Sequence, residues 1–129
     1  MTTTVQEIVD ELATVGSVES GTPHRRARFA AAALSVRYEL VDDDGAVRPY
    51  VMRVDGDGCA IAEAGAAAAA EDIVIRTDPT TLHRVLTGGL SGRDAIVGGR
   101  LDIRRLPSMP KLLLMRSLFT RYQKTVRRG

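Results

Sequence analysis

Apolar residues recur at helical spacing near both ends of the chain. In residues 5–15 they return every three or four positions, which is the period of an amphipathic helix. Thr4 and Glu7 open this run with the spacing of a capping box, and Gly16 predicts its end. Residues 111–128 carry a second apolar stripe with a basic side opposite to it. The pattern therefore predicts one helix at each end of the chain.

The two sides of the predicted C-terminal helix differ in chemistry. Its apolar stripe comprises Leu112, Met115, Leu118, Phe119, Tyr122 and Val126. Its other side carries Arg116, Arg121, Lys124, Arg127 and Arg128. Such a basic side is either a solvated surface or a face that meets anionic lipid headgroups, and the sequence leaves both open.

Between these helices the period changes to two, which is typical of β-strands. The run 34–40 alternates apolar and polar side chains and predicts a half-buried strand. A second strand follows, with Tyr50, Met52 and Val54 on one face. The turns that bound it are "DDDG" at 42–45 and "DGDG" at 55–58, and a third strand, "CAIAEA", ends at Gly65. These three strands predict an antiparallel meander.

Two short helices are predicted after a fourth strand, "DIVIRT". Asp78 caps the first helix, Pro79 takes its first position and Gly88 closes it. Ser91 caps the second helix, which ends at Gly98. A fifth strand, "RLDIRR", then leads to "PSMP", whose prolines predict a break before the C-terminal helix.

Five glycines between residues 86 and 105 raise the question of phosphate binding. A P-loop ends in Gly-Lys-Ser/Thr, and a dinucleotide fingerprint opens a helix directly after a strand. Here the glycine pairs 88–89 and 98–99 follow short helices instead. We expect them to adopt positive φ angles and to end those helices.

Composition and charge fit one globular domain over residues 1–129. Residues 1–28 form the N-terminal helix and a polar loop, and 111–128 form the C-terminal helix. A net charge of +2 is too small to indicate a nucleic-acid partner. The single cysteine, Cys59, excludes an internal disulfide. With no signal-peptide pattern and no apolar run of membrane-spanning length, the sequence favours a cytoplasmic protein.

The residues able to do chemistry are not arranged for it. Cys59 begins a strand with no histidine beside it, so we expect a small buried side chain. His24 and His83 lack the spacing of metal ligands and are expected to be solvated. The "DDDG" run lacks the further acidic ligands of a calcium loop. We therefore expect neither catalytic residues nor a cofactor nor a metal.

The ordered set of a strand ending in "DG", "EDIVIRTD", a short helix, "LTGGLSGRDAIVGGRLDI" and an amphipathic final helix resembles the sterol carrier protein type 2 family. The resemblance covers residues 29–119. It implies an α+β fold in which helices cover a mixed, largely antiparallel five-stranded sheet. It also implies an apolar tunnel between sheet and helices, with no catalytic residues in the domain.

The residues expected to line this tunnel are Tyr50, Met52, Val54, Ile75, Leu82, Leu86, Ile103, Met109, Leu112, Met115 and Phe119. Each methionine is either an adaptable pocket wall or core filling. The expected function is non-catalytic binding and transfer of a lipid-like ligand (fatty acyl, sterol or isoprenoid), with transient contact with an anionic membrane. The alternative is an accessory module that presents an isoprenoid or acyl substrate to a partner enzyme.

Overall fold

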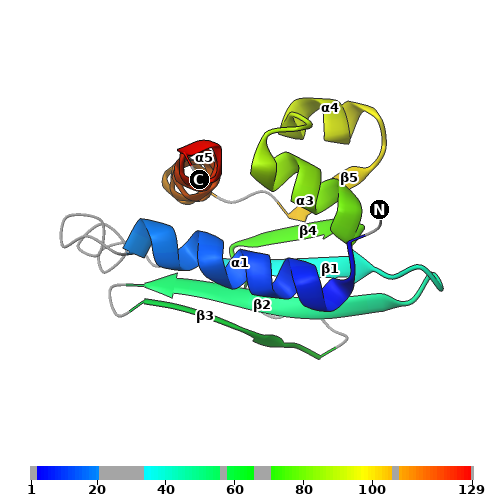
Figure 1. Cartoon of the computed structure of the whole chain (residues 1–129). Coiled ribbons are helices and arrows are strands. Elements are labelled where there is room, and N and C mark those ends of the chain that lie inside the picture. Colours follow the sequence, from blue (N-terminus) through cyan, green and yellow to red (C-terminus); the bar gives the residue numbers. More distant parts are fainter. Residues whose placement is uncertain (1–2, 21–33, 56–57, 66–70, 106–107, 129) are drawn as a thin grey trace.

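Helices cover one face of a five-stranded sheet (Figure 1). The computed structural model describes residues 3–20, 34–55, 58–65, 71–105 and 108–128. Their elements are α1 (Val5–Ser20), β1 (Leu34–Val41), β2 (Val47–Asp55), β3 (Gly58–Glu63), β4 (Ile73–Thr77), α3 (Pro79–Thr87), α4 (Gly92–Val97), β5 (Leu101–Arg105) and α5 (Met109–Arg128). The predicted α+β class is confirmed.

Helix α1 begins at the predicted capping box. The Thr4 N–H donates to Glu7 Oε1 over 3.1 Å, and the Glu7 N–H donates to Thr4 Oγ1 over 3.2 Å. The predicted end at Gly16 is wrong, because the helix continues to Ser20. One interior glycine costs only about 1 kcal/mol of helix propensity, which the burial of the apolar side of α1 offsets. The rest of the predicted loop, 21–28, lies outside the described residues.

Strand β1 lies at the centre of the sheet, whose order is β3-β2-β1-β4-β5. It pairs antiparallel with β2 and parallel with β4, and the outer pairs β2/β3 and β4/β5 are antiparallel. The turn between β1 and β2 is as predicted: Gly45 has φ +83° and donates its N–H to the Asp42 carbonyl over 2.9 Å. Asp55 and Gly58 pair across the next hairpin, whose residues 56–57 lie outside the description.

Both faces of β1 are buried, so the prediction of a half-buried strand is wrong. Besides the apolar side chains that face the helices, Ser35, Arg37 and Glu39 are buried on the opposite face, where Arg37 is only 1% exposed. Gly65, which follows β3, and Glu71, which precedes β4, lie on this face: Arg37 Nη2 donates to the carbonyl of Gly65 over 2.5 Å, and Arg37 Nη1 faces Glu71. Alternation along a strand does not reveal which segment packs on its polar side.

Three charged side chains accompany the buried Arg37. Its Nε lies 3.3 Å from Glu39 Oε2, and its Nη1 lies 4.0 Å from Glu71 Oε1. The other oxygen of Glu39 lies 3.1 Å from Arg76 Nη2. A guanidinium removed from water needs such partners, since an unpaired buried charge costs several kcal/mol. The network therefore ties β1 to β4 and to the chain that enters β4.

The caps of α3 and α4 are as predicted. Asp78 Oδ2 accepts from the Thr81 N–H over 2.9 Å, and Gly88 ends α3 with φ +85°. Ser91 Oγ accepts from the Asp94 N–H over 3.0 Å at the start of α4. After α4, Gly98 has φ −76°, and the positive φ (+73°) is found at Gly99.

Helix α5 begins two residues earlier than predicted. Met109 and Pro110 form its first turn, and the Leu112 N–H donates to the carbonyl of Ser108 over 3.0 Å. The predicted break at Pro110 is wrong, because a proline in the first turn forfeits no helical hydrogen bond. Pro107 lies outside the described residues.

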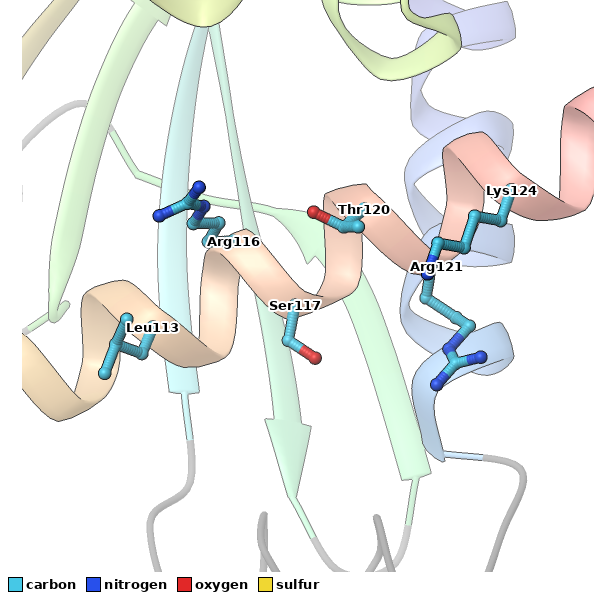
Figure 2. Close-up of a pocket in the computed structure, with 6 residues that line it drawn as sticks. All are labelled: Leu113, Arg116, Ser117, Thr120, Arg121 and Lys124. Atoms are coloured by element: carbon cyan, nitrogen blue, oxygen red, sulfur yellow. The ribbon is translucent and has the colours of Figure 1, made fainter.

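The two sides of α5 are well separated. Its buried side chains are Leu114, Met115, Leu118 and Tyr122, with Leu112 and Phe119 half-buried. Val126, predicted in the apolar stripe, is exposed, and Leu114 takes its place in the core. The side turned away from the sheet carries Arg116, Arg121 and Lys124 (Figure 2).

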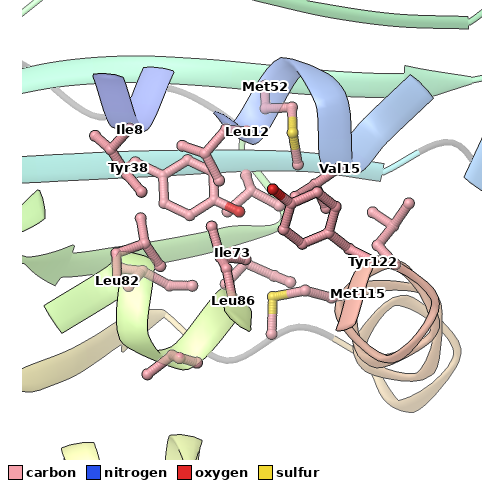
Figure 3. Packing of buried hydrophobic residues seen from close by; sticks show 14 of the residues in the cluster. Ile8, Leu12, Val15, Tyr38, Met52, Ile73, Leu82, Leu86, Met115 and Tyr122 are labelled. Carbon is pink, nitrogen blue, oxygen red and sulfur yellow. The ribbon is translucent and has the colours of Figure 1, made fainter. Parts of the chain in front are cut away.

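One apolar core fills the space between the sheet and the helices (Figure 3). The labelled side chains come from α1 (Ile8, Leu12, Val15), the sheet (Tyr38, Met52, Ile73), α3 (Leu82, Leu86) and α5 (Met115, Tyr122). Burial raises the pKa of Tyr38 well above its ordinary value, and its hydroxyl has no hydrogen-bond partner within the described part of the chain.

Glu11 of α1 links three helices at the edge of this core. Its Oε2 accepts from the hydroxyl of Tyr122 on α5 over 2.7 Å, and its Oε1 lies 2.6 Å from Nδ1 of His83 on α3. The His83 side chain is 45% exposed, as the prediction of a solvated histidine requires, and it also has Glu11 as a partner, which the sequence did not reveal. His24 lies outside the described residues.

We predict that Arg37→Met lowers the free energy of unfolding by about 3 kcal/mol or more, because Glu39 and Glu71 lose their buried cation. Arg48→Met is the matched control. It breaks an exposed ion pair with Asp42 on the same hairpin and should cost far less, since water screens that pair. Urea unfolding followed by circular dichroism measures both. Equal effects would contradict a buried network.

We predict that Tyr122→Phe destabilises the protein by about 1.5 kcal/mol or more at neutral pH, because a hydrogen bond to a carboxylate is lost. Burial and this hydrogen bond raise the pKa of Tyr122 to about 12. In the unfolded chain the phenol ionises near pH 10. The stabilisation is thus complete below pH 10 and disappears as pH rises through 12. Unfolding free energies of both proteins across this range test it; a difference that grows above pH 10 would refute it.

Candidate ligand-binding site

A pocket of about 870 Å³ lies where α3, α4 and α5 meet β4 and β5. Its described lining consists of Ile75, Val85, Gly88, Leu90, Ser91, Gly92, Arg93, Ile96, Val97, Leu101, Ile103, Leu112, Met115, Arg116, Phe119, Thr120 and Gln123. This lining is mainly aliphatic. We call it the apolar pocket. Its size lies within the range of small-molecule sites in proteins.

Strands form one wall of the apolar pocket and helices form the others. Ile75 of β4 and Ile103 of β5 are paired neighbours in the sheet and share a face. Leu112, Met115 and Phe119 recur at three- and four-residue spacing along α5 and so present one side of that helix. The regular spacing of side chains along β4, β5 and α5 therefore forms these walls of the pocket.

The glycines around α4 position the remaining wall. Gly88 turns the chain out of α3, and Ser91 starts α4 only three residues later. Gly99 reverses the chain with φ +73°, a conformation that most side chains disfavour. The glycines of this stretch thus place the short α4 beside β5.

Apolar side chains are left in contact with solvent at the α4 side of the pocket. Ile96 is 45% exposed and Val97 is 79% exposed, although both line the pocket. Two polar lining residues are already engaged in the fold: Gln123 Nε2 donates to the carbonyl of Val85 over 3.0 Å, and Ser91 caps α4. The pocket thus offers chiefly apolar surface.

The predicted site residues separate into three groups. Those that line the apolar pocket are Ile75, Ile103, Leu112, Met115 and Phe119. Those that are fully buried core residues and do not line it are Met52, Val54, Leu82 and Leu86. Tyr50 is half-buried at the edge of the core, and Met109 is 65% exposed at the start of α5. A role in ligand binding stays a prediction for all of them.

Several residues that line the apolar pocket are not among those predicted from the sequence. Val85, Leu90, Ile96, Val97 and Leu101 belong to α3, α4 and the segments beside them. Helix α4 has six residues, which is too short for a clear amphipathic period. The available signal was the adjacent pair Ile96–Val97 on a helix bounded by glycines, since both could not point into the core.

A second hollow follows the outward side of α5 (Figure 2). Its volume is about 430 Å³, and its described lining is Leu113, Arg116, Ser117, Thr120, Arg121 and Lys124. We call it the basic groove. In Figure 2, Arg116 projects toward one edge of the helix, whereas Ser117 and Arg121 project toward the other. Arg116 and Thr120 also line the apolar pocket.

The other reactive groups show no activated arrangement. Burial and the nearby Asp55 raise the pKa of the Cys59 thiol, whereas a nucleophile needs a lowered one. The His83–Glu11 pair lies outside the lining of both hollows. In the part of the chain that the structure describes, no three His, Cys, Asp or Glu side chains gather as metal ligands. None of the helices described there has the length and apolarity to cross a membrane.

Comparison of the sequence with protein-family models gives no match, and comparison with curated proteins gives none. Solved structures do match. The sterol carrier protein domain 2 of Helicoverpa armigera aligns with 91% of this chain and 89% of its own, at 11% identity and a TM-score of 0.64. The ubiquinone synthesis protein UbiJ-SCP2 aligns with 92% of this chain and 90% of its own, at 13% identity and a TM-score of 0.60.

The same fold occurs inside a larger enzyme. A variant of the sec-alkylsulfatase PisA1 from a Pseudomonas species aligns with 90% of this chain at 15% identity and a TM-score of 0.60. This chain spans only 16% of that enzyme, whereas it spans about nine tenths of the two sterol carrier domains. The helices, the sheet and the extent of these alignments show that the chain has the fold of sterol carrier protein 2 domains.

Proposed function

We propose that this chain binds a lipid-like apolar ligand in the apolar pocket without transforming it. The observation that carries the proposal is a hollow of about 870 Å³ with a mainly aliphatic lining, beside exposed Ile96 and Val97. Exposed apolar side chains at a concave site are typical of a surface that a ligand covers. In this proposal residues 1–129 act as one cytoplasmic domain.

Burial alone supplies the affinity. Each Å² of apolar surface removed from water contributes about 25 cal/mol, and part of this gain is lost in ordering the ligand. No proton transfer or nucleophilic attack is required.

Loading takes place at an anionic lipid surface. Helix α5 carries six basic residues and no acidic residue. The rest of the chain then has twelve basic and sixteen acidic residues, a formal charge of −4. An anionic surface would therefore orient the molecule with α5 toward it, since each basic residue near such a surface contributes about 1 kcal/mol. The apolar pocket borders this helix.

The second candidate is an accessory module that presents its ligand to a partner enzyme. It is favoured by the names of the structural neighbours: one is a ubiquinone synthesis protein, and another is an alkylsulfatase of which the fold is a part. Both candidates use the same apolar pocket. They differ in whether an enzyme must be present for the ligand to leave.

We predict saturable binding of cis-parinaric acid with roughly micromolar Kd, equivalent to about −8 kcal/mol. Ile96→Glu should weaken it about tenfold or more, because it places a carboxylate at the apolar pocket. Val47→Glu is the matched control, since Val47 is a similarly exposed residue on β2 that lines neither hollow. Fluorescence titration measures all three proteins. Absence of saturable binding to the wild type would refute the proposed function.

We predict that Arg121→Glu with Lys124→Glu slows probe transfer from vesicles containing phosphatidylserine about tenfold or more at low salt. Affinity for the dissolved probe should stay nearly unchanged. The control, Arg53→Glu with Arg104→Glu, alters the net charge equally at exposed positions of the sheet. If both pairs slow transfer alike, net charge is responsible and the orientation by α5 is wrong. Resonance energy transfer between vesicle and protein follows the rate.

A further inference from the structure

The two edges of the sheet differ in their protection against pairing with another strand. Edge strands present unpaired peptide groups, and proteins commonly block them with charged side chains, prolines or bulges. Strand β5 follows this rule: three of its five residues are charged, and its register with β4 shifts between Val74 and Ile75. Strand β3 forms the other margin of the sheet in Figure 1, and its sequence is "GCAIAE". Its one charge is at the last residue, so β3 is the open edge.

The outward peptide groups of β3 follow from its pairing with β2. The Ala64 N–H donates to the carbonyl of Pro49 over 2.9 Å, so the peptide groups of Ala64 point inward. In an antiparallel pair this direction alternates along the strand, so those of Ala60 and Ala62 also point inward. The peptide groups that point outward belong to Cys59, Ile61 and Glu63. No described residue supplies these groups with a partner.

We propose that β3 pairs antiparallel with β3 of a second copy of this chain, about a two-fold axis at Ile61. Ile61 then lies opposite Ile61 of the second copy, and Cys59 lies opposite Glu63 of the second copy. Each opposed pair exchanges both of its backbone hydrogen bonds, so every outward group of the three residues gains a partner. The edge is thus complementary to itself, which is the condition for the isologous contact of a two-fold dimer.

The side chains of β3 permit this pairing on both faces of the sheet. On the face away from the helices, Ala60 lies opposite Ala62 of the second copy, and both are small and exposed. On the helix face, Ile61 is only half-buried against the core and gains an apolar neighbour. Glu63 faces Cys59 rather than another carboxylate, so the register brings no like charges together.

The dimer leaves the ligand site free. The two-fold axis is perpendicular to the sheet, so the helices of both copies lie on the same face of one continuous sheet. The apolar pocket borders β4 and β5, at the opposite edge from β3, and stays open in both copies. One strand pair is smaller than a standard interface of about 1,600 Å², so the dimer is weak and its population rises with protein concentration.

Sedimentation equilibrium at increasing concentrations of the full chain tests the pairing. Ala60→Glu with Ala62→Glu places carboxylates opposite each other at both Ala60–Ala62 contacts and should raise the dimer Kd about tenfold or more. Ala60→Glu with Ala62→Lys is the matched control, because opposite charges then meet at the same contacts. Its Kd should equal that of the wild type or be lower. Both positions are exposed, so urea unfolding should show similar monomer stability in all three proteins.

Disulfide trapping tests the register independently. In an antiparallel hydrogen-bonded pair the opposed Cα atoms are about 5.5 Å apart, within the span of a disulfide. Ile61→Cys in a Cys59→Ser background should therefore form a covalent dimer under mild oxidation. In the wild type the two copies of Cys59 are about 13 Å apart, four residues of strand rise, and should not cross-link. Non-reducing electrophoresis compares the two proteins.

Three results would overturn the inference. A wild type that stays monomeric at all concentrations shows that the edge accepts at most a strand of another protein. Equal weakening of the dimer by both double variants shows that Ala60 and Ala62 do not meet across the two-fold axis. Cross-linking of wild-type Cys59 as readily as of the Ile61→Cys protein shows a different register. The binding of cis-parinaric acid depends on none of these outcomes, so the proposed function stands or fails separately.

Discussion

A sheet with one apolar face is stable only when that face is covered, and the described helices α1, α3, α4 and α5 cover it unevenly. Over β3, β2 and β1, the helices α1 and α5 bring long aliphatic side chains such as Ile8, Leu12 and Leu118 into full burial. Over β4 and β5 the cover consists of the end of α3, one side of α5 and the six-residue α4. The apolar pocket lies at this thinner part of the cover.

Met115 belongs to both regions. It is part of the buried core and also lines the apolar pocket, so it forms the wall between them. Methionine has three rotatable bonds and adapts to irregular surroundings. The chain has no tryptophan and only two phenylalanines, and Phe119 stands at this same wall. A boundary made of flexible and aliphatic side chains can follow ligands of different shape more easily than one made of large rings.

Charged side chains are buried and paired on one side of the fold and lie at the surface on the other. On the face of the sheet away from the helices, Arg37 and its carboxylate partners are buried and hold Gly65 and Glu71 against β1. On α5, Arg116, Arg121 and Lys124 lie on the side turned away from the sheet. Glu11 lies in neither of these places. Its carboxylate accepts a hydrogen bond from Tyr122 and pairs with His83, and so holds α1, α3 and α5 together.

The sequence by itself determined the local structure. Caps at Thr4, Asp78 and Ser91, the positive φ at Gly88 and the order of the elements all depend on neighbours within a few residues, and the structure confirms them. The helix ends were less predictable. α1 passes Gly16 because burial elsewhere along the helix outweighs a small local penalty.

Only the tertiary structure decided which apolar residues are core and which line the pocket. Met52 and Ile75 both lie on the apolar face of a strand and both are buried, yet only Ile75 lines the apolar pocket. Leu82 and Leu112 both lie on the apolar side of a helix, yet only Leu112 lines it. It also decided that Arg37 is buried and that His83 meets Glu11, 72 positions away. Periodicity indicates on which face of its own helix or strand a side chain lies. What it meets there depends on segments distant in sequence, and their packing appears only once the chain has folded.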